Sequence, residues 1–326
     1  VLQLIEPQQT FVFENVDAPP VPSILRDFSA PVVLDCASAE AELVHLLAHD
    51  SDPFNRWEAG QRLFGQLIRE AVSRLANGKA PLWPVSVIEA GRKVLVGAGD
   101  PAFIAEALTL PGESTLTEQM EIVDPELLFA ARCGLARFLA HGLESDLLRL
   151  YHALAPTAPY QPDNLGAARR RLRNLCLGYL NELDSPEYRT LARQQFDATD
   201  NMTDQFAALA VLANATGEEG DRALADFYAR WQGEALVVDK WLAVQSSSRL
   251  PGTLARVESL TQHAAFDIRN PNKVYALLRT FGANHRHFHA ADGTGYRFVA
   301  EQIVRLDPIN PQVASRLARS FAVEAF

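Results

Sequence analysis

The sequence predicts an all-α protein in which a long series of helices stacks into an irregular, HEAT- or armadillo-like superhelix (a solenoid). Three observations support this fold. Apolar residues recur with the 3.6-residue period of a helix from about residue 38 onward. Capping residues stand directly before proline at six positions, and no strand pattern interrupts the helical segments. The spacing has no fixed period of the tetratricopeptide or ankyrin kind, and a compact α-helical bundle is the alternative arrangement.

Residues 1–36 differ from the rest of the chain. Phe11 and Phe13 flank Val12 at strand spacing, and three prolines between positions 19 and 22 interrupt any helix. We therefore predict a short β segment over 1–36, followed by a helical domain over 37–326. Because a few strands are marginally stable alone, they need a sheet that this chain does not supply.

The helical domain shows its periodicity most clearly in four stripes of apolar residues. They run over 57–75, 172–183, 224–231 and 296–306. In the second stripe the apolar residues fall at i, i+3, i+4, i+7, i+8 and i+11, which places them on one face of a helix. We interpret these stripes as core rather than as binding surfaces.

Six helix starts are marked by a capping residue followed by proline. The side-chain oxygen accepts a hydrogen bond from a free N–H of the first turn, and proline at the next position loses no donor that was paired. The six pairs are Asp52-Pro53, Asp100-Pro101, Asp124-Pro125, Ser185-Pro186, Asn270-Pro271 and Asn310-Pro311.

The composition is that of an ordinary globular protein and argues against a nucleic-acid surface. The 326 residues carry a net charge of -10, whereas phosphate neutralisation needs clustered Lys and Arg. The densest basic run, 169–171 with Arg173, falls inside a helical pattern, and we interpret it as a solvated face.

No apolar run reaches the roughly 18 residues of a membrane helix. Three widely spaced cysteines favour reduced thiols in a cytoplasmic protein.

A run of histidines is the first candidate for a metal site. His285, His287 and His289 alternate along the chain, but Arg286 stands between two of them and no carboxylate or thiolate accompanies them. A loop that joins two helices is the simpler interpretation, and the metal site is kept as a weaker hypothesis.

Other catalytic patterns are missing from the sequence. His45 and His49 have the spacing of two zinc ligands, yet no glutamate lies between them as in a His-Glu-x-x-His metallopeptidase. There is no Gly-x-Ser-x-Gly motif and no phosphate loop. We therefore predict no catalytic residue, metal site or cofactor in this chain.

Several strings, collinear over nearly the whole chain, resemble the bacterial aminopeptidase N branch of the M1 zinc metallopeptidases. The strings are Phe11-Val-Phe-Glu-Asn-Val16, Pro22-Ser-Ile-Leu-Arg-Asp-Phe-Ser-Ala-Pro31, Asn201-Met-Thr-Asp204, Val238-Asp-Lys-Trp241, Asn270-Pro-Asn272, Phe288-His-Ala290, Asp292-Gly-Thr-Gly-Tyr296 and Asn310-Pro-Gln-Val-Ala-Ser-Arg-Leu317.

The resemblance implies a large enzyme made of an N-terminal β domain, a thermolysin-like zinc domain, a β-sandwich and a C-terminal helical superhelix. This chain matches the end of the third part and most of the fourth, so we expect a piece of a longer polypeptide. The family's zinc motif and its Gly-x-Met-Glu-Asn segment are absent. The one zinc ion is expected in the missing zinc domain, and the chain alone is expected to be inactive.

In that family the C-terminal domain closes over the zinc domain and lines the cavity through which peptides arrive. By resemblance, Gln312 and Arg316 match positions that face the cavity, and their four-residue spacing places them on one helix face. A guanidinium there would attract the carboxylate of a peptide substrate or set the field of the channel. Tyr275 stands where some relatives carry a second cavity arginine, which weakens the idea of a basic gate.

The resemblance therefore favours the non-catalytic C-terminal region of a cytoplasmic aminopeptidase. Its expected partners are the catalytic and β-sandwich domains of the same polypeptide and peptide substrates, with no nucleic acid and no membrane span. The alternative is an autonomous helical-repeat adaptor that binds a protein in its concave groove. Residues 1–36 discriminate against the adaptor, because a free-standing solenoid has no reason to carry these strands.

Overall fold

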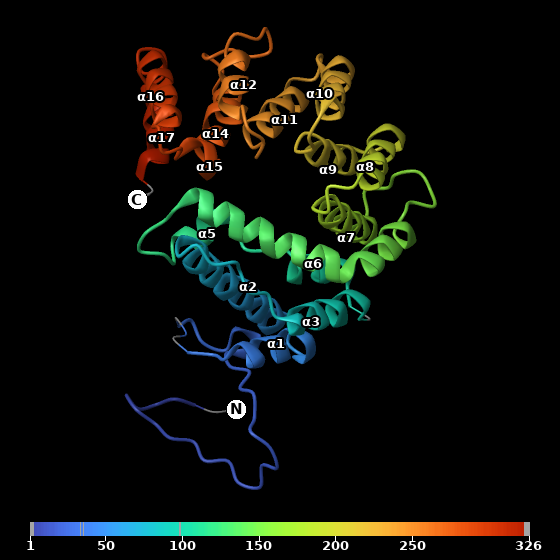
Figure 1. Ribbon diagram of the computed structural model, residues 1–326, viewed down its shortest axis with the longest axis vertical. Coiled ribbons are helices and arrows are strands. Elements are labelled where there is room, and N and C mark those ends of the chain that lie inside the picture. The colour runs from blue at the N-terminus through green and yellow to red at the C-terminus, as the bar shows by residue number, and fades with distance from the viewer. Residues whose placement is uncertain (1–2, 33, 35, 98, 323–326) are drawn as a thin grey trace.

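The computed structural model describes residues 3–32, 34, 36–97 and 99–322. Within these residues every regular element is a helix, which confirms the predicted all-α fold (Figure 1). The elements are the short 3₁₀ helix η1 (Arg26–Phe28), α1 (Glu40–His49), α2 (Pro53–Ala76), α3 (Val85–Val96), α4 (Pro101–Ala107), α5 (Glu113–Thr117), α6 (Pro125–Ala153), α7 (Asn164–Asn181), α8 (Pro186–Ala198), α9 (Met202–Leu212), α10 (Glu218–Trp231), α11 (Ala235–Ser246), α12 (Thr253–Leu260), α13 (Pro271–Val274), the π-helix η2 (Tyr275–Arg279), α14 (Thr280–Gly282), α15 (His285–Phe288), α16 (Thr294–Leu306), α17 (Pro311–Ala318) and the 3₁₀ helix η3 (Arg319–Ala322).

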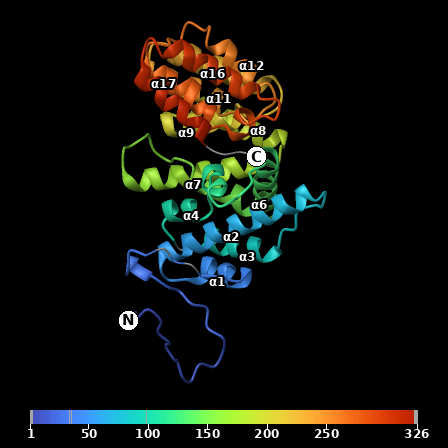
Figure 2. The same cartoon turned by 90° about the vertical axis from the view of Figure 1, so that its left-hand side faces the viewer.

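Helices that follow one another in the chain pack side by side, as in an armadillo-like solenoid. α1 contacts α2 and α3, α6 packs along α2 and α7, and α8 pairs with α9. Figure 1 shows the path from α6 through α9 and α11 turning in a wide arc, and Figure 2 shows α1 and α16 at opposite ends of the molecule. The array is therefore a curved superhelix and not a compact bundle.

The apolar stripes of the sequence form the core. In α7, Cys176 and Leu180 are fully buried and Leu172 is almost fully buried. In α16, Val299 is fully buried and Leu306 is almost fully buried. Each buried aliphatic side chain of this size stabilises the fold by about 1.5–3 kcal/mol. Buried apolar residues from α1 through α17 belong to one cluster, so the solenoid has a continuous interior.

All six helix starts predicted from the capping residue and proline are confirmed. At each one the side-chain oxygen accepts a hydrogen bond from a backbone N–H of the first turn, and proline occupies the start of the helix. Asp124, for example, accepts from the amide of Leu127 at 3.0 Å at the start of α6. Because the cap acts within one turn, it could be identified from sequence alone.

The strands predicted for residues 1–36 are not formed. Residues 3–32, 34 and 36 contain no regular element except η1, and the side chains of Leu4, Ile5, Val12 and Phe13 are exposed. A strand needs a neighbour that pairs with its N–H and C=O groups, and the described residues of the helical domain offer no sheet edge. The side chains of Leu4, Ile5, Val12 and Phe13 therefore stay exposed, whereas Phe28 packs against Phe54 of α2 with ring centres 4.4 Å apart.

One arginine predicted to lie on a solvated face is buried instead. Arg173 is 9% exposed, donates to the hydroxyl of Tyr151 at 2.9 Å and stacks over that ring at 4.4 Å. Its guanidinium also lies 3.9 Å from the carboxylate of Asp204. The interpretation was wrong for this residue because partners on α6 and α9, far away in sequence, compensate the buried charge.

Two further features are the state of the cysteines and the apolar character of the helices. The cysteines Cys36, Cys133 and Cys176 are all free thiols. Across the part of the chain that the structure describes, no helix has both the length and the apolar character needed to cross a membrane.

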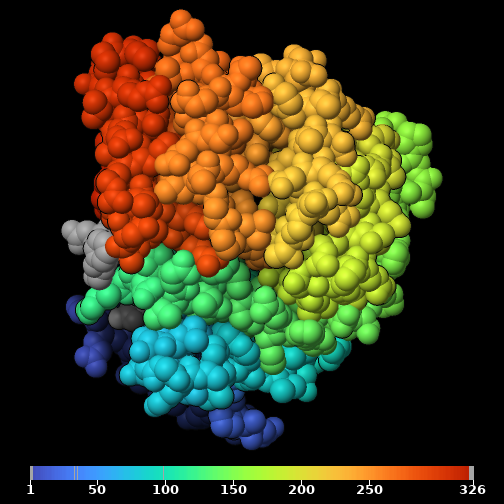
Figure 3. All heavy atoms as spheres, turned by 45° about the horizontal axis from the view of Figure 1, so that its top comes forward, coloured from blue at the N-terminus to red at the C-terminus, as the bar shows by residue number. Residues whose placement is uncertain are grey.

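The late part of the superhelix returns to its early part through α15. Arg286 pairs with Glu126 at 3.0 Å and lies over the ring of Phe129 at 4.3 Å, both in α6. His285 Nε2 lies 3.5 Å from the hydroxyl of Ser114 in α5. In the space-filling view the C-terminal helices rest directly on the green segment that contains α5 and α6 (Figure 3). We call this contact of α15 with α5 and the start of α6 the closure contact.

Candidate functional site

The structure brings two of the three predicted cavity residues together at the C-terminal end of the superhelix. Arg316 of α17 donates from Nη1 to the hydroxyl of Tyr275 at 3.2 Å. Gln312 lies one turn earlier on α17, and both Gln312 and Arg316 are exposed. The cap of Asn310, which accepts from the amide of Val313 at 3.1 Å, fixes the start of this helix and hence the direction of both side chains.

A second arginine at this place was missed by the sequence analysis. The guanidinium of Arg279 lies 5.8 Å from the centre of the Tyr275 ring, within cation–π range. Both residues belong to the π-helix η2, and Thr280 donates from its hydroxyl to the carbonyl of Tyr275 at 3.2 Å. π-helical turns are rare and frequently occur at functional sites. The four-residue spacing from Tyr275 was the only sequence pattern that pointed to Arg279.

Two exposed cations, Arg279 and Arg316, lie beside the half-buried phenol of Tyr275, and we call these three residues the tyrosine–arginine cluster. A guanidinium offers a planar fork of donors that matches a carboxylate or phosphate. Position 275 holds a tyrosine and not an arginine, but Arg279 places a second guanidinium beside the same ring. This end of the molecule therefore still carries two positive charges. The cluster can hold an anion but contains no group that would act as nucleophile or general base at neutral pH.

The three histidines around Arg286 do not form one site. His285 and His289 stack with ring centres 5.4 Å apart, and Nδ1 of His289 lies 2.7 Å from the hydroxyl of Tyr296. His287 lies against the carbonyl groups of Arg249 and Leu250 instead. The predicted loop is in fact the one-turn helix α15, whose winding separates the side chains.

A metal site is not found among the residues that the structure describes, because no three His, Cys, Asp or Glu side chains come together as a ligand group. His45 and His49 do stack, with ring centres 5.0 Å apart. However, the ammonium group of Lys93 lies 2.8 Å from Nε2 of His49, and burial together with this charge lowers the pKa of that imidazole. A cation thus already occupies the position where a metal ion would bind.

A cavity of about 470 Å³ opens on the inner face of the superhelix. Its walls include Arg137, Arg249 and Arg286, which come from α6, the α11–α12 connection and α15. Arg249 pairs with Glu182 at 2.7 Å, and Arg137 donates to the carbonyl of the same residue at 3.2 Å. Burial raises the pKa of the Cys133 thiol in this wall, so the nucleophilic thiolate is disfavoured. The cations of this cavity are therefore largely satisfied by the protein itself.

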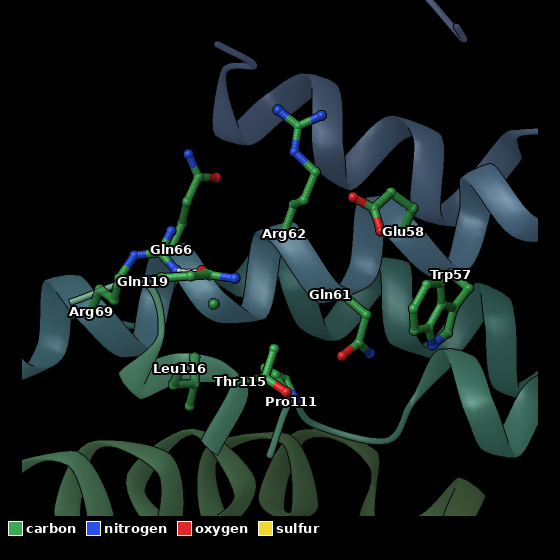
Figure 4. Close-up of a pocket in the computed structure, with 11 residues that line it drawn as sticks. Trp57, Glu58, Gln61, Arg62, Gln66, Arg69, Pro111, Thr115, Leu116 and Gln119 are labelled. Carbon is green, nitrogen blue, oxygen red and sulfur yellow. Dashed lines mark hydrogen bonds between the residues drawn. The ribbon is translucent and has the colours of Figure 1, made fainter. Parts of the chain in front are cut away.

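A second cavity of about 470 Å³ lies between α2 and α5 (Figure 4). Arg69 donates to the side chain of Gln119, and Gln61 donates to the carbonyl of Thr109 at 2.9 Å. Among the residues that line it, Glu58 is the single carboxylate. A polar wall with one carboxylate and no histidine or cysteine provides no pair of groups for acid–base or nucleophilic catalysis.

Two family descriptions match the chain. Residues 40–323 match "Domain of unknown function (DUF3458_C) ARM repeats", and residues 1–37 match "Domain of unknown function (DUF3458) Ig-like fold". The first of these covers most of the chain.

Several characterised proteins are similar to this chain over nearly all of its length. Aminopeptidase N of Escherichia coli is 38% identical over 319 residues, and aminopeptidase N of Caulobacter vibrioides is 38% identical over 321 residues. Each alignment covers 97% of this chain and 37% of the relative, so the chain spans little more than a third of these proteins. The solved structure of Legionella pneumophila aminopeptidase A in complex with aspartic acid is also similar, with a TM-score of 0.84, 34% identity and coverage of 95% of this chain and 37% of that one.

Proposed function

Because this chain belongs to the DUF3458_C family of ARM-repeat domains, we propose that it is the non-catalytic helical end of an enzyme of the aminopeptidase N type, which removes N-terminal amino acids from peptides. The observation that carries the proposal is the identity of 38% to aminopeptidase N over 97% of the chain. The aminopeptidases themselves are longer, so the rest of the enzyme would supply the catalytic groups.

We divide the chain into residues 1–36, which complete a β-sandwich in the whole enzyme, and residues 37–326, which form the superhelical domain. The match of residues 1–37 to an Ig-like family supports this division. The exposed Val12 and Phe13 support it as well, because a sandwich would bury such side chains. The partners of the chain are then the β-sandwich and catalytic domains of the same polypeptide, and the three free thiols fit a cytoplasmic enzyme.

The zinc ion that the family resemblance implies would lie in the catalytic domain of that enzyme. The residues present here do not fit it, since the described part of the chain holds no group of three or more candidate ligands. We therefore derive no catalytic step from this chain. Its role would be to shape the approach to the active site.

Within that role we propose that Gln312, Arg316 and Tyr275 line the cavity through which peptides reach the active site. The exposure of Gln312 and Arg316 and the hydrogen bond from Arg316 to Tyr275 support this assignment, because they leave a guanidinium held in place on an accessible surface. Such a group would attract the carboxylate at the far end of a peptide.

The 326-residue chain alone is expected to release no product from an aminoacyl anilide and to bind no zinc in stoichiometric amount. Absorbance of the released aniline and metal analysis of untagged protein measure the two quantities. The longer polypeptide encoded by the same gene serves as the positive control. Chelator-sensitive hydrolysis by the pure chain would contradict the proposal.

In the whole enzyme, Arg316→Ala is expected to raise KM for a peptide with a free carboxylate about tenfold, which corresponds to about 1.4 kcal/mol. Hydrolysis of an aminoacyl anilide should change little, because that substrate has no carboxylate to lose contact with. Arg316→Lys should recover part of the effect, and Arg222→Ala, at an exposed position of α10, is the matched control. Equal effects on both substrates would show that Arg316 does not contact the peptide end.

A further inference from the structure

Three histidines lie at the closure contact or directly beside it, where the late part of the superhelix meets its early part. His285 and His289 are each 5% exposed, and His287 is half-buried. Nδ1 of His285 and Nε2 of His287 are buried and have no hydrogen-bond partner among the described residues. A buried imidazole that leaves a nitrogen unpaired is tolerated as the neutral ring, whereas the cation would need a partner or water at both nitrogens.

Charged and titratable groups face these histidines from each neighbouring element. Glu113 of α5 lies near His285, and Glu126 of α6 lies near His287, so both carboxylates favour protonation. Arg286 opposes protonation of His287, and His285 opposes protonation of His289. The side of His289 that faces α16 meets only the hydroxyl of Tyr296, a neutral group.

We propose that the closure contact is a proton-operated clasp, which holds the superhelix closed while His285 and His287 are neutral and releases α15 from α5 and α6 when they are protonated. The feature that carries the proposal is the position of the buried His285 and the half-buried His287 at a contact between segments 160 to 171 residues apart. The cavity on the inner face includes Phe129 on one side of this contact and Arg286 on the other, so release of the clasp would also widen that cavity. This inference concerns the chain itself and does not rest on the proposed function.

The direction of the pH dependence follows from burial. Desolvation is the largest cause in all three cases and lowers the pKa of His285, His287 and His289, the last to about 4. When the clasp opens, water reaches His285 and His287, and the pKa values of these two rings return toward the ordinary value of about 6.5. The closed form is therefore fully stabilised above about pH 6.5, and this stabilisation is lost as the pH falls below that value.

The opening can be measured as a distance between the two sides of the clasp in the full 326-residue chain. Nitroxide labels on Glu118→Cys and Arg297→Cys lie at exposed positions beyond α5 and on α16. The partly exposed thiols are removed as Cys36→Ser and Cys133→Ala, and the buried Cys176 is retained. We expect a single short distance at pH 7.5 and a second, longer distance that becomes the major one near pH 5 and disappears when the pH is raised again.

Variants of the clasp test whether the histidines cause the transition. His285→Gln combined with His287→Gln should abolish the opening or shift its midpoint by at least one pH unit to lower pH. Glu113→Gln removes a carboxylate that favours protonated His285 within the closed contact, so it destabilises the protonated closed form and should move the midpoint in the opposite direction, to higher pH; this variant remains informative if the double variant does not fold. His141→Gln, at an exposed position of α6, is the matched control and should leave the midpoint unchanged.

Three results would overturn the clasp. The first is a distance that does not change between pH 7.5 and pH 5. The second is an unchanged midpoint in both Glu113→Gln and the folded double variant. The third is an opening that coincides with loss of the helical circular dichroism signal, because it would report unfolding of the whole chain.

Discussion

Replacing Gly295 with alanine is expected to destabilise the chain by about 3 kcal/mol, at the upper end of the usual range for overpacking. A Cβ at position 295 would lie 2.5 Å from the carbonyl oxygen of His287 and 2.8 Å from Cα of Phe288. These are backbone atoms of α15, which a rotamer change cannot move away. The substitution would therefore force α16 and α15 apart, and urea unfolding followed by circular dichroism measures the loss.

Gly178 supplies the matched control for this change. It lies inside α7, and a Cβ added there would meet no atom within 4 Å. Alanine should therefore stabilise the helix by about 0.5–1 kcal/mol, because glycine loses more backbone entropy on folding. Equal effects of alanine at 178 and 295 would show that the close approach of α16 to α15 is not what requires glycine at 295.

Asp204→Ala is expected to cost about 3–5 kcal/mol, the usual range for removing one partner of a buried ion pair. Asp204 is 1% exposed and accepts hydrogen bonds from Asn174 at 2.8 Å and Asn201 at 3.1 Å. Its carboxylate also lies 3.9 Å from the buried guanidinium of Arg173. Alanine would leave that cation without its carboxylate and the amide of Asn174 without its acceptor, and thermal and urea unfolding should both record the loss.

Two further variants test whether the loss of stability comes from breaking the buried pair of Asp204 and Arg173 or from removing any carboxylate. Asp226→Ala removes a carboxylate that pairs with Arg193 at 2.7 Å but is 54% exposed, so we expect a change of at most about 1 kcal/mol. Adding Arg173→Met to Asp204→Ala should recover part of the stability, because the unpaired charge disappears. A double variant no more stable than Asp204→Ala alone would contradict the assignment of the cost to Arg173.

The parts of the fold that could be predicted from sequence are those decided within one helical turn. The cap of Asp124 and the apolar face from Leu172 to Leu180 depend on neighbours three or four residues away, and both were predicted correctly. Burial of Arg173 depends on Tyr151 and Asp204, which belong to other helices, and local periodicity carries no information about them. The strands of residues 1–36 were predicted from side-chain alternation, but alternation does not supply the hydrogen-bonding neighbour that a strand requires.

The candidate site, too, could be predicted from sequence only where it depends on residues within one helical turn. The shared helix face of Gln312 and Arg316 follows from their spacing, while the contact of Arg316 with Tyr275 joins two helices and could not be derived from it. Arg279 went unnoticed because a cation four residues from a tyrosine is common on helix surfaces. Its significance comes from the π-helical turn and from α17 packing beside it.

The return of α15 to α6 has a consequence for how the molecule assembles. In an open solenoid each repeat touches only its neighbours, so structure can grow from any point and spread. Here Arg286 must find Glu126 across 160 residues of chain, a long loop whose ordering opposes the contact until the intervening helices are in place. We therefore expect the closure contact to form late in folding. Once it has formed, fraying at one end of the superhelix should also destabilise the other end.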